Sequence, residues 1–202
     1  MSPRSIEISR KMREKSRKAI LSASLELFAT SGYSATTTDA IAKKAGISKG
    51  LIFTHFKKKQ DILFAIFDEQ FASILPRFIT ENDRRPAKEK VVALIDTWLD
   101  VIKTNPLAVR LSLQLNLDDE YRKILRSKKT MEYFENFLSA MVKTIKDAGS
   151  KKPELDTYLL MFLFDGIVAN YTVAPELFPI DAIKDHFVGL LSSGWKSGEG
   201  RR

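Results

Sequence analysis

Residues Thr37 to Phe56 read TTDAIAKKAGISKGLIFTHF, and this segment predicts two short helices joined by a tight turn. A hydroxyl of Thr37 or Thr38 is placed to cap the first helix. That helix should end at Gly46, because glycine readily adopts the positive φ that closes a helix. Ser48 then caps the second helix. This order of caps and turn is typical of a helix-turn-helix.

Two further residues of the turn fit the same motif. Ala45 is small enough to let the two helices approach closely, and Ile47 is an apolar plug for the corner between them. The second helix, over residues 49–55, begins with Lys49 and is followed by three lysines at 57–59. A helix with this charge can enter a major groove while the lysines bind flanking phosphates.

Helical periodicity extends over nearly the whole chain, and sustained period-two alternation is almost absent. The sequence therefore predicts an all-α protein of about nine helices. The first helix ends at Gly32 and could begin as early as Ser9, and Pro76 is expected to kink or end the fourth. The expected helices cover about 9–31, 38–45, 49–55, 59–76, 87–104, 106–116, 118–148, 153–173 and 180–194.

Positive charge is concentrated at the N-terminal end of the chain. The sequence has 33 Lys and Arg against 25 Asp and Glu, a net charge of +8. Thirteen basic and five acidic residues lie in 1–65, so this segment alone carries +8, while the rest of the chain holds 20 of each sign. A basic head on a neutral body indicates a polyanion-binding module joined to a part with another task, unless the basic face is merely solvated.

The composition excludes several kinds of site. The chain has no cysteine and only two histidines, His55 and His186, which are far apart in sequence. Disulfides, thiolate chemistry and a histidine-rich metal site are therefore not expected. No P-loop, glycine-rich dinucleotide motif or nucleophile elbow is present, so we predict neither an enzyme nor a cofactor.

Signals for a membrane or for export are also weak. The first 18 residues are polar and basic without an apolar core. The most apolar stretch, 158–174, is shorter than the roughly 20 residues that span a bilayer, and it contains Asp165 and Asn170. We therefore expect a soluble, cytoplasmic protein with a buried helix in this region.

A set of positions at fixed spacing extends the helix-turn-helix pattern on both sides, from about Lys18 to Leu63. These positions are Ile20, Ala23, Leu27-Phe28, Gly32-Tyr33, Thr36-Thr37-Thr38, Ile41-Ala42, Ala45-Gly46-Ile47-Ser48-Lys49-Gly50, Phe53-Thr54-His55-Phe56, Lys59 and Leu63. In these positions the segment resembles the DNA-binding domain of the TetR (tetracycline-repressor) family of transcriptional regulators. The resemblance implies a helix-turn-helix domain over residues 1–58, including a basic arm, and a helical effector-binding and dimerisation domain over 59–202.

The family resemblance also implies which residues meet DNA. Residues 49–55 would form the recognition helix, with Lys49 as the candidate for a base contact, since lysine can donate to guanine O6 and N7. Gly50 would let the backbone approach DNA, whereas Phe53 replaces the tyrosine that is commonest in the family. The hydroxyls and cations placed at or near phosphates are those of Thr38, Ser48, Thr54, His55 and Lys59. For His55, a packed neutral ring is the alternative.

A single recognition helix is too small to define a unique genomic site, so a two-fold dimer on a palindromic operator is expected. In proteins like TetR, the two C-terminal helices of each subunit form a four-helix interface. Here these would be residues 153–173 and 180–194, and the alternative is that both belong to the core of a single chain.

The resemblance further implies an apolar effector pocket among the central helices, where an aromatic stripe would otherwise be core. Gln114 and Asp165 could orient a ligand there or be satisfied by backbone partners. The predicted ligand-binding residues are Phe67, Phe71, Trp98, Leu113, Leu117, Phe134, Phe137, Phe162 and Asp165.

These observations predict a dimeric, sequence-specific transcriptional regulator. It would be a repressor released from its operator by a small, largely apolar effector, with the fourth helix as the mechanical link. The alternative is a helical protein that binds nucleic acid or an anionic surface without sequence preference, which would lose its affinity with salt and ignore base order.

Overall fold

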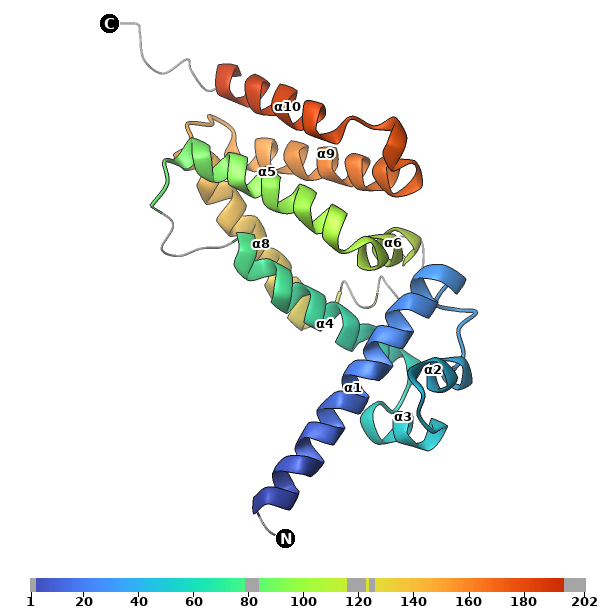
Figure 1. Cartoon of the computed structure of the whole chain (residues 1–202). Helices are drawn as coiled ribbons and strands as arrows, with labels where there is room; N and C mark the ends of the chain where they lie inside the picture. The colour runs from blue at the N-terminus through green and yellow to red at the C-terminus, as the bar shows by residue number, and fades with distance from the viewer. Residues whose placement is uncertain (1–2, 79–83, 116–122, 124–125, 195–202) are drawn as a thin grey trace, which may run out of the picture. The chain divides into compact units, whose positions relative to one another are not determined.

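The computed structural model describes residues 3–78, 84–115, 123 and 126–194. Over these residues the chain is helical and contains no strand, so the predicted all-α class is confirmed (Figure 1). The elements are α1 (Pro3–Ser31), α2 (Thr38–Ala45), α3 (Lys49–His55), α4 (Lys59–Phe78), α5 (Ala87–Thr104), α6 (Pro106–Leu115), α8 (Lys128–Asp147), α9 (Pro153–Val173), the short 3-10 helix η1 (Pro175–Leu177) and α10 (Ile180–Gly194).

The chain divides into two compact units. Unit 1 consists of Met1–Phe71 and Arg110–Arg126, and unit 2 of Ala72–Val109 and Ser127–Arg202. The division passes through α4, and it groups α6 with the helix-turn-helix. The boundary between residues 58 and 59 concerns function rather than packing, and it stays a prediction.

Unit 1 has a closed apolar core. Ile20 and Phe28 of α1, Ile41 of α2 and Leu63 of α4 have no exposed surface, and Ile52 of α3 is 1% exposed. Helices α2 and α3 have only eight and seven residues and are too short to be stable alone, so the shared core holds them in place. Helix α6 adds two buried leucines to this core, Leu111 and Leu115.

Unit 2 is built from α5, α8, α9 and α10. The buried faces carry aliphatic residues at helical spacing, as an amphipathic helix requires. The ring of Trp98 stacks on Phe164 with centroids 4.5 Å apart. The other core residues are Val91, Leu94, Ile95, Leu99, Ile102, Phe137, Met141, Ile145, Ala148, Leu160 and Ile180.

Two sequence-based helix limits need correction. The predicted single helix 118–148 is wrong, because residues 126 and 127 are a turn and a bend. Ser127 caps a new helix there, accepting a hydrogen bond from the Thr130 amide at 3.3 Å. Residues 116–122 and 124–125 of the predicted helices lie outside the described residues.

The first helix begins at Pro3 rather than near Ser9. Its early residues are mainly polar, so no apolar periodicity marked them. Pro76 lies inside the last turn of α4, and the helix ends two residues later at Phe78, as expected for a proline near a helix terminus.

Candidate nucleic-acid interface

The first helix of the motif, α2, starts with a side-chain cap. Thr37 is the N-cap residue, with extended backbone angles, and its hydroxyl oxygen accepts a hydrogen bond from the Ala40 amide at 3.1 Å. Of the two threonines that sequence allowed as the cap, Thr37 therefore has this role. Thr38 is the first residue of α2, and its side chain is half-buried.

The turn between α2 and α3 has a left-handed closure at Gly46, whose φ is 67° and ψ is 33°. The amide of Ile47 donates to the carbonyl of Ala42 at 3.0 Å, which completes the helix end. The oxygen of Ser48 then accepts from the Leu51 amide at 3.3 Å and begins α3. The sequence-predicted turn is thus present in each of its parts.

Helix α3 has one buried side and one exposed side. Ile52 faces the core, whereas Lys49, Gly50, Phe53 and Thr54 are exposed. A side chain at Gly50 would meet nothing within 4 Å, so the fold of unit 1 does not require glycine there. The exposed side is therefore free to approach another molecule closely.

Lys49 forms an ion pair across the motif. Its Nζ lies 2.9 Å from Oδ2 of Asp39, in the first turn of α2, and both side chains are at least half exposed. Exposed pairs of this kind contribute only about 0–1 kcal/mol. Lys49 can therefore exchange Asp39 for an acceptor on a ligand at small cost.

His55 ends α3 and contacts α1. Its Nε2 is 2.8 Å from the hydroxyl oxygen of Ser16. Burial lowers the pKa of His55 below its ordinary value, and the nearby guanidinium groups of Arg13 and Arg17 lower it further. The ring is thus biased towards the neutral form, as in the packed alternative, while an anion beside it would favour the charged form.

Lys59 has a structural role that the sequence did not reveal. Its Nζ donates to the carbonyl oxygens of Tyr33 at 2.7 Å, Thr36 at 2.8 Å and Ser34 at 3.3 Å. It also lies 4.4 Å from the centroid of the Tyr33 ring. The ammonium group therefore holds the connection between α1 and α2, and its contact with phosphate stays a prediction.

The predicted effector residues fall into both units. Phe67 belongs to the core of unit 1, and Leu113 is half-buried on α6. Gln114 donates from Nε2 to the carbonyl of Ala29 at 3.1 Å, which supports its structural alternative. The side chain of Phe71 and the whole of Leu117 lie outside the described residues.

In unit 2, two of the predicted effector residues are brought together. Trp98 and Phe137 have ring centroids 6.1 Å apart, and Phe78 contacts both rings edge-on. The indole N–H of Trp98 is buried and has no hydrogen-bond partner among the described residues. An orphan donor inside an aromatic cluster is unusual and is a place where a ligand's acceptor atom could bind.

Three other predicted effector residues lie at the surface of unit 2. Phe134 is 42% exposed and Phe162 is 66% exposed. Asp165 is also exposed, and partial desolvation raises the pKa of its carboxyl. The described structure does not join these residues to the Trp98 cluster, and their assignment stays a prediction.

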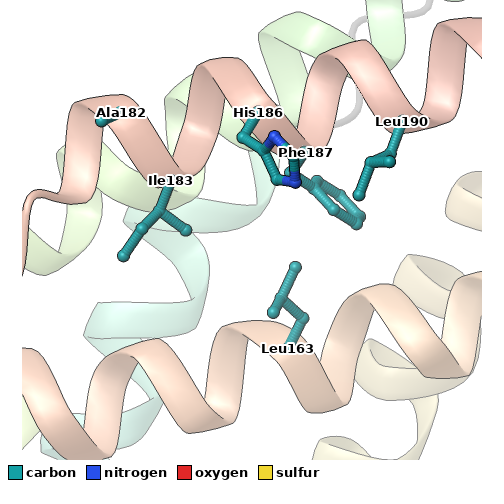
Figure 2. A pocket seen from close by; sticks show the side chains of 6 residues that line it. All are labelled: Leu163, Ala182, Ile183, His186, Phe187 and Leu190. Atoms are coloured by element: carbon teal, nitrogen blue, oxygen red, sulfur yellow. The ribbon is translucent and has the colours of Figure 1, made fainter.

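Helices α9 and α10 border an open apolar groove of about 410 Å³. Figure 2 shows Leu163 of α9 pointing towards α10, where Ile183 and Phe187 lie on the facing side with His186. A second groove of about 300 Å³ continues along the same two helices. In the part of the chain that the structure covers, no helix is long and apolar enough to cross a bilayer.

Comparison with known proteins gives a family match to the N-terminal part of unit 1. Residues 20–66 match the model of bacterial regulatory proteins of the tetR family. The fatty acid metabolism regulator protein of Bacillus subtilis (strain 168) is 26% identical over 182 residues, which are 87% of this chain and 93% of that protein.

Solved structures share the whole fold. The fatty acid degradation regulator FadR from Bacillus halodurans superposes with a TM-score of 0.74 at 18% identity, covering 92% of this chain and 97% of that one. FadR from Bacillus subtilis, solved in complex with stearoyl-CoA, gives a TM-score of 0.72 at 23% identity, with 88% and 98% covered. At these identities the superpositions show a common fold.

Proposed function

Since this chain belongs to the TetR family of transcriptional regulators, we propose that it is a homodimeric repressor of a palindromic operator. A small, largely apolar effector releases it from DNA. The observation that carries the proposal is the α2–turn–α3 geometry, which presents Lys49 and the bare backbone of Gly50 on the exposed side of a short helix. A helix of this kind reads base edges in the major groove.

The contacts to DNA that we propose follow this geometry. Lys49 leaves Asp39 and donates to a guanine edge. The hydroxyls of Thr38, Ser48 and Thr54 and the cations of His55 and Lys59 lie towards phosphates, which fix the register of α3. Residues 1–58 thus form the DNA-binding domain, and 59–202 the effector and dimerisation domain.

We assign dimerisation to the exposed faces of α9 and α10. Exposed apolar or small residues recur along α9 with alternating steps of four and three, which is the pattern of a helix–helix seam. Leu159 and Phe162 are each 66% exposed, and Val173 is 83% exposed. The full stripe is Leu155, Leu159, Phe162, Gly166, Ala169 and Val173.

The glycines of these helices support the same assignment. Gly166 of α9 and Gly189 of α10 lie inside helices, where glycine costs roughly 0.5–1 kcal/mol relative to alanine. A side chain at either position would meet nothing within 4 Å in the single chain. Close approach by the backbone of a second copy would give both glycines a packing reason.

For the effector, we propose a ligand with a long acyl chain. The relative with a similar fold was solved with stearoyl-CoA, and a regulator of fatty acid metabolism is similar over most of the chain. The aromatic cluster of Phe78, Trp98 and Phe137 is the kind of apolar surface that receives such a chain. The orphan N–H of Trp98 would donate to a carbonyl oxygen of the ligand.

Release requires that the effector favour one conformation over another. We propose that α4 transmits the change, because this helix begins at Lys59 in unit 1 and ends at Phe78 in unit 2. Phe78 contacts Trp98 and Phe137, so a ligand among these rings acts directly on the end of α4.

The test is selection of bound fragments from sheared source DNA by wild type and Lys49→Ala at about 150 mM salt, where weak phosphate-only binding is screened. Wild type should enrich a palindrome, and the variant should lose or relax it. The enriched duplex is then titrated with stearoyl-CoA and with free coenzyme A, which lacks the acyl chain, and only stearoyl-CoA should release the protein. Equal binding with and without stearoyl-CoA would contradict the effector class, and absence of any enriched site would contradict operator recognition.

A further inference from the structure

The first turns of α1 lie outside the part of the molecule that the family match covers. Helix α1 begins at Pro3, whereas the match begins at residue 20. Every residue from 5 to 15 is exposed, and the core of unit 1 begins at Ile20. Figure 1 shows this end of α1 projecting beyond α2 and α3. Packing in the core of unit 1 therefore does not explain why α1 extends over these turns.

A stripe of arginines runs along this projecting segment. Arg10, Arg13 and Arg17 are spaced by three and four residues, so they share one face of the helix. Seven residues after Arg13 and Arg17 come Ile20 and Ser24, both with no exposed surface. The arginine stripe is therefore the outward continuation of the face that packs inside unit 1.

The inner end of the stripe is attached to the recognition helix. Arg17 pairs with Glu69 of α4 and lies 5.6 Å from the ring centroid of Phe56, directly after α3. The neighbouring Ser16 is 2.8 Å from His55, the last residue of α3. These contacts fix the direction of α1 relative to α3. When α3 binds DNA, the positions of the outer arginines are therefore set as well.

The outer arginines, Arg10 and Arg13, differ from Arg17 in their ion pairing. Among the residues that the structure describes, no carboxylate pairs with Arg10 or Arg13, whereas Lys11, on another face, pairs with Glu7 at 2.8 Å. Arg13 is also close enough to His55 to act on its charge. Two guanidinium groups without an ion pair among the described residues thus lie on the face of α1 that carries Arg17.

We propose that Arg10 and Arg13 bind phosphates of the DNA that flanks the operator, so that the first turns of α1 form a second contact surface beside the helix-turn-helix. This inference rests on the proposed function. Guanidinium groups bind phosphate through two parallel hydrogen bonds and keep their charge at any physiological pH. From Arg10 to Arg17 the helix rises by about 10 Å at roughly 1.5 Å per residue, a length that reaches past the recognition helix along the backbone.

A membrane or a partner helix is a poorer fit for this segment. Its exposed apolar residues are Ile6, Ile8 and Met12, and Ile6 lies on a different side of the helix from the other two. They do not form the continuous apolar stripe that either partner requires. Charge, and not apolar area, is what the segment offers.

The test compares two double variants of equal charge. R10A/R13A removes the stripe, and K11A/K15A removes two cations from another face of the same turns; both introduce alanine, which favours the helix. Affinity is measured by fluorescence anisotropy at several salt concentrations, on the operator with long flanks and on the same operator trimmed to its ends. Circular dichroism checks that both variants remain helical.

For R10A/R13A on the long duplex, the negative slope of log K against log salt should become less steep by about 2 per protomer. Each lost phosphate contact removes about 0.9 from its magnitude. On the trimmed duplex it should match wild type, and K11A/K15A should retain the wild-type slope on both. Equal slopes for the two variants on the long duplex would overturn the inference while leaving operator recognition intact. If operator recognition itself fails, the wild type would instead bind DNA without any sequence preference.

Discussion

The exposed side of α3 in unit 1 (the recognition face) and the exposed side of α9 and α10 in unit 2 (the apolar face) carry side chains of opposite chemistry. On α3 the exposed charge of Lys49 is held by a weak pair with Asp39, over a core in which Ile52 is 1% exposed. On α9 the exposed side chains are large and apolar, Leu159 and Phe162 among them. The proposed DNA interface therefore presents exchangeable charges above a complete core, whereas the proposed dimer interface presents apolar area that a single chain leaves uncovered.

The largest effect should come from breaking the apolar face. L159D/F162D places two charges in the proposed four-helix interface, so the dimer should dissociate, as expected when hot-spot residues are lost. Operator affinity should then fall by about a hundredfold or more, because a monomer binds only one half-site. Sedimentation velocity measures the oligomer, and anisotropy measures DNA binding. Met131→Asp, at a position of α8 that is 41% exposed, is the control for an added surface charge. A variant that stays dimeric would rule out this face as the interface.

The recognition face should respond to a smaller change in a single residue. Lys49→Ala removes the proposed base contact, and a good base contact carries about 1–3 kcal/mol of discrimination, or roughly a tenfold to hundredfold preference. The ratio of operator to random-duplex affinity should fall accordingly, while random-duplex affinity changes little. Lys57→Ala is the matched control, because it removes an exposed lysine just after α3. Equal losses of the ratio in both variants would show that Lys49 acts only through its charge.

A third prediction separates folding from binding within unit 1. Lys59→Met keeps much of the side-chain volume but removes the donor to the carbonyls of Tyr33, Ser34 and Thr36. The free energy of unfolding should fall by about 2 kcal/mol, since hydrogen bonds to charged groups contribute about 1.5–3 kcal/mol. Thermal unfolding followed by circular dichroism measures this change. Lys58→Met should leave stability nearly unchanged, and a similar loss there would show that only local charge matters.

The smallest effect concerns pH. The pKa of His55 is lowered in the folded chain, so unfolding takes up a proton as pH falls below the ordinary value of about 6.5. Stability should therefore be fully present above that pH and decrease as pH falls towards the folded pKa. A phosphate beside His55 favours the charged ring, so operator affinity should instead rise over this range. Thermal unfolding and fluorescence anisotropy, measured over this pH range for wild type and His55→Gln, check the two predicted trends. Identical pH profiles for the two proteins would exclude His55 as the source of the trends.

Local signals in the sequence predicted much of the fold. Caps, glycine stops and prolines are read from neighbouring residues, which is why the limits of α2, α3, α5 and α9 agree with the predicted ones. The cap at Ser127 was overlooked because the apolar periodicity on both sides of it suggested one helix. The start of α1 was missed because polar residues carry no periodic signal.

Contacts between distant residues could not be predicted in the same way. The Ser16–His55 hydrogen bond joins residues 39 positions apart, and Lys59 reaches carbonyls more than 20 positions away. Such pairs depend on how helices pack, and packing is not encoded in any single window of sequence. The same reason explains why an aromatic stripe indicated an effector region but did not distinguish Trp98, inside a cluster, from Phe162, at the surface.

The lack of packing around the projecting turns of α1 also determines how fast their backbone amides exchange with solvent. A helical segment without tertiary packing is only marginally stable, so amide hydrogens over residues 5–15 should exchange with deuterium within seconds. Those near Ile20 and Phe28, in the core of unit 1, should be protected far longer. Within α1, operator DNA held by Arg10 and Arg13 would slow exchange over these outer turns and not near Ile20 and Phe28. In that case, part of the affinity for DNA would be used to order this helical segment, and the exchange rates would give its cost residue by residue.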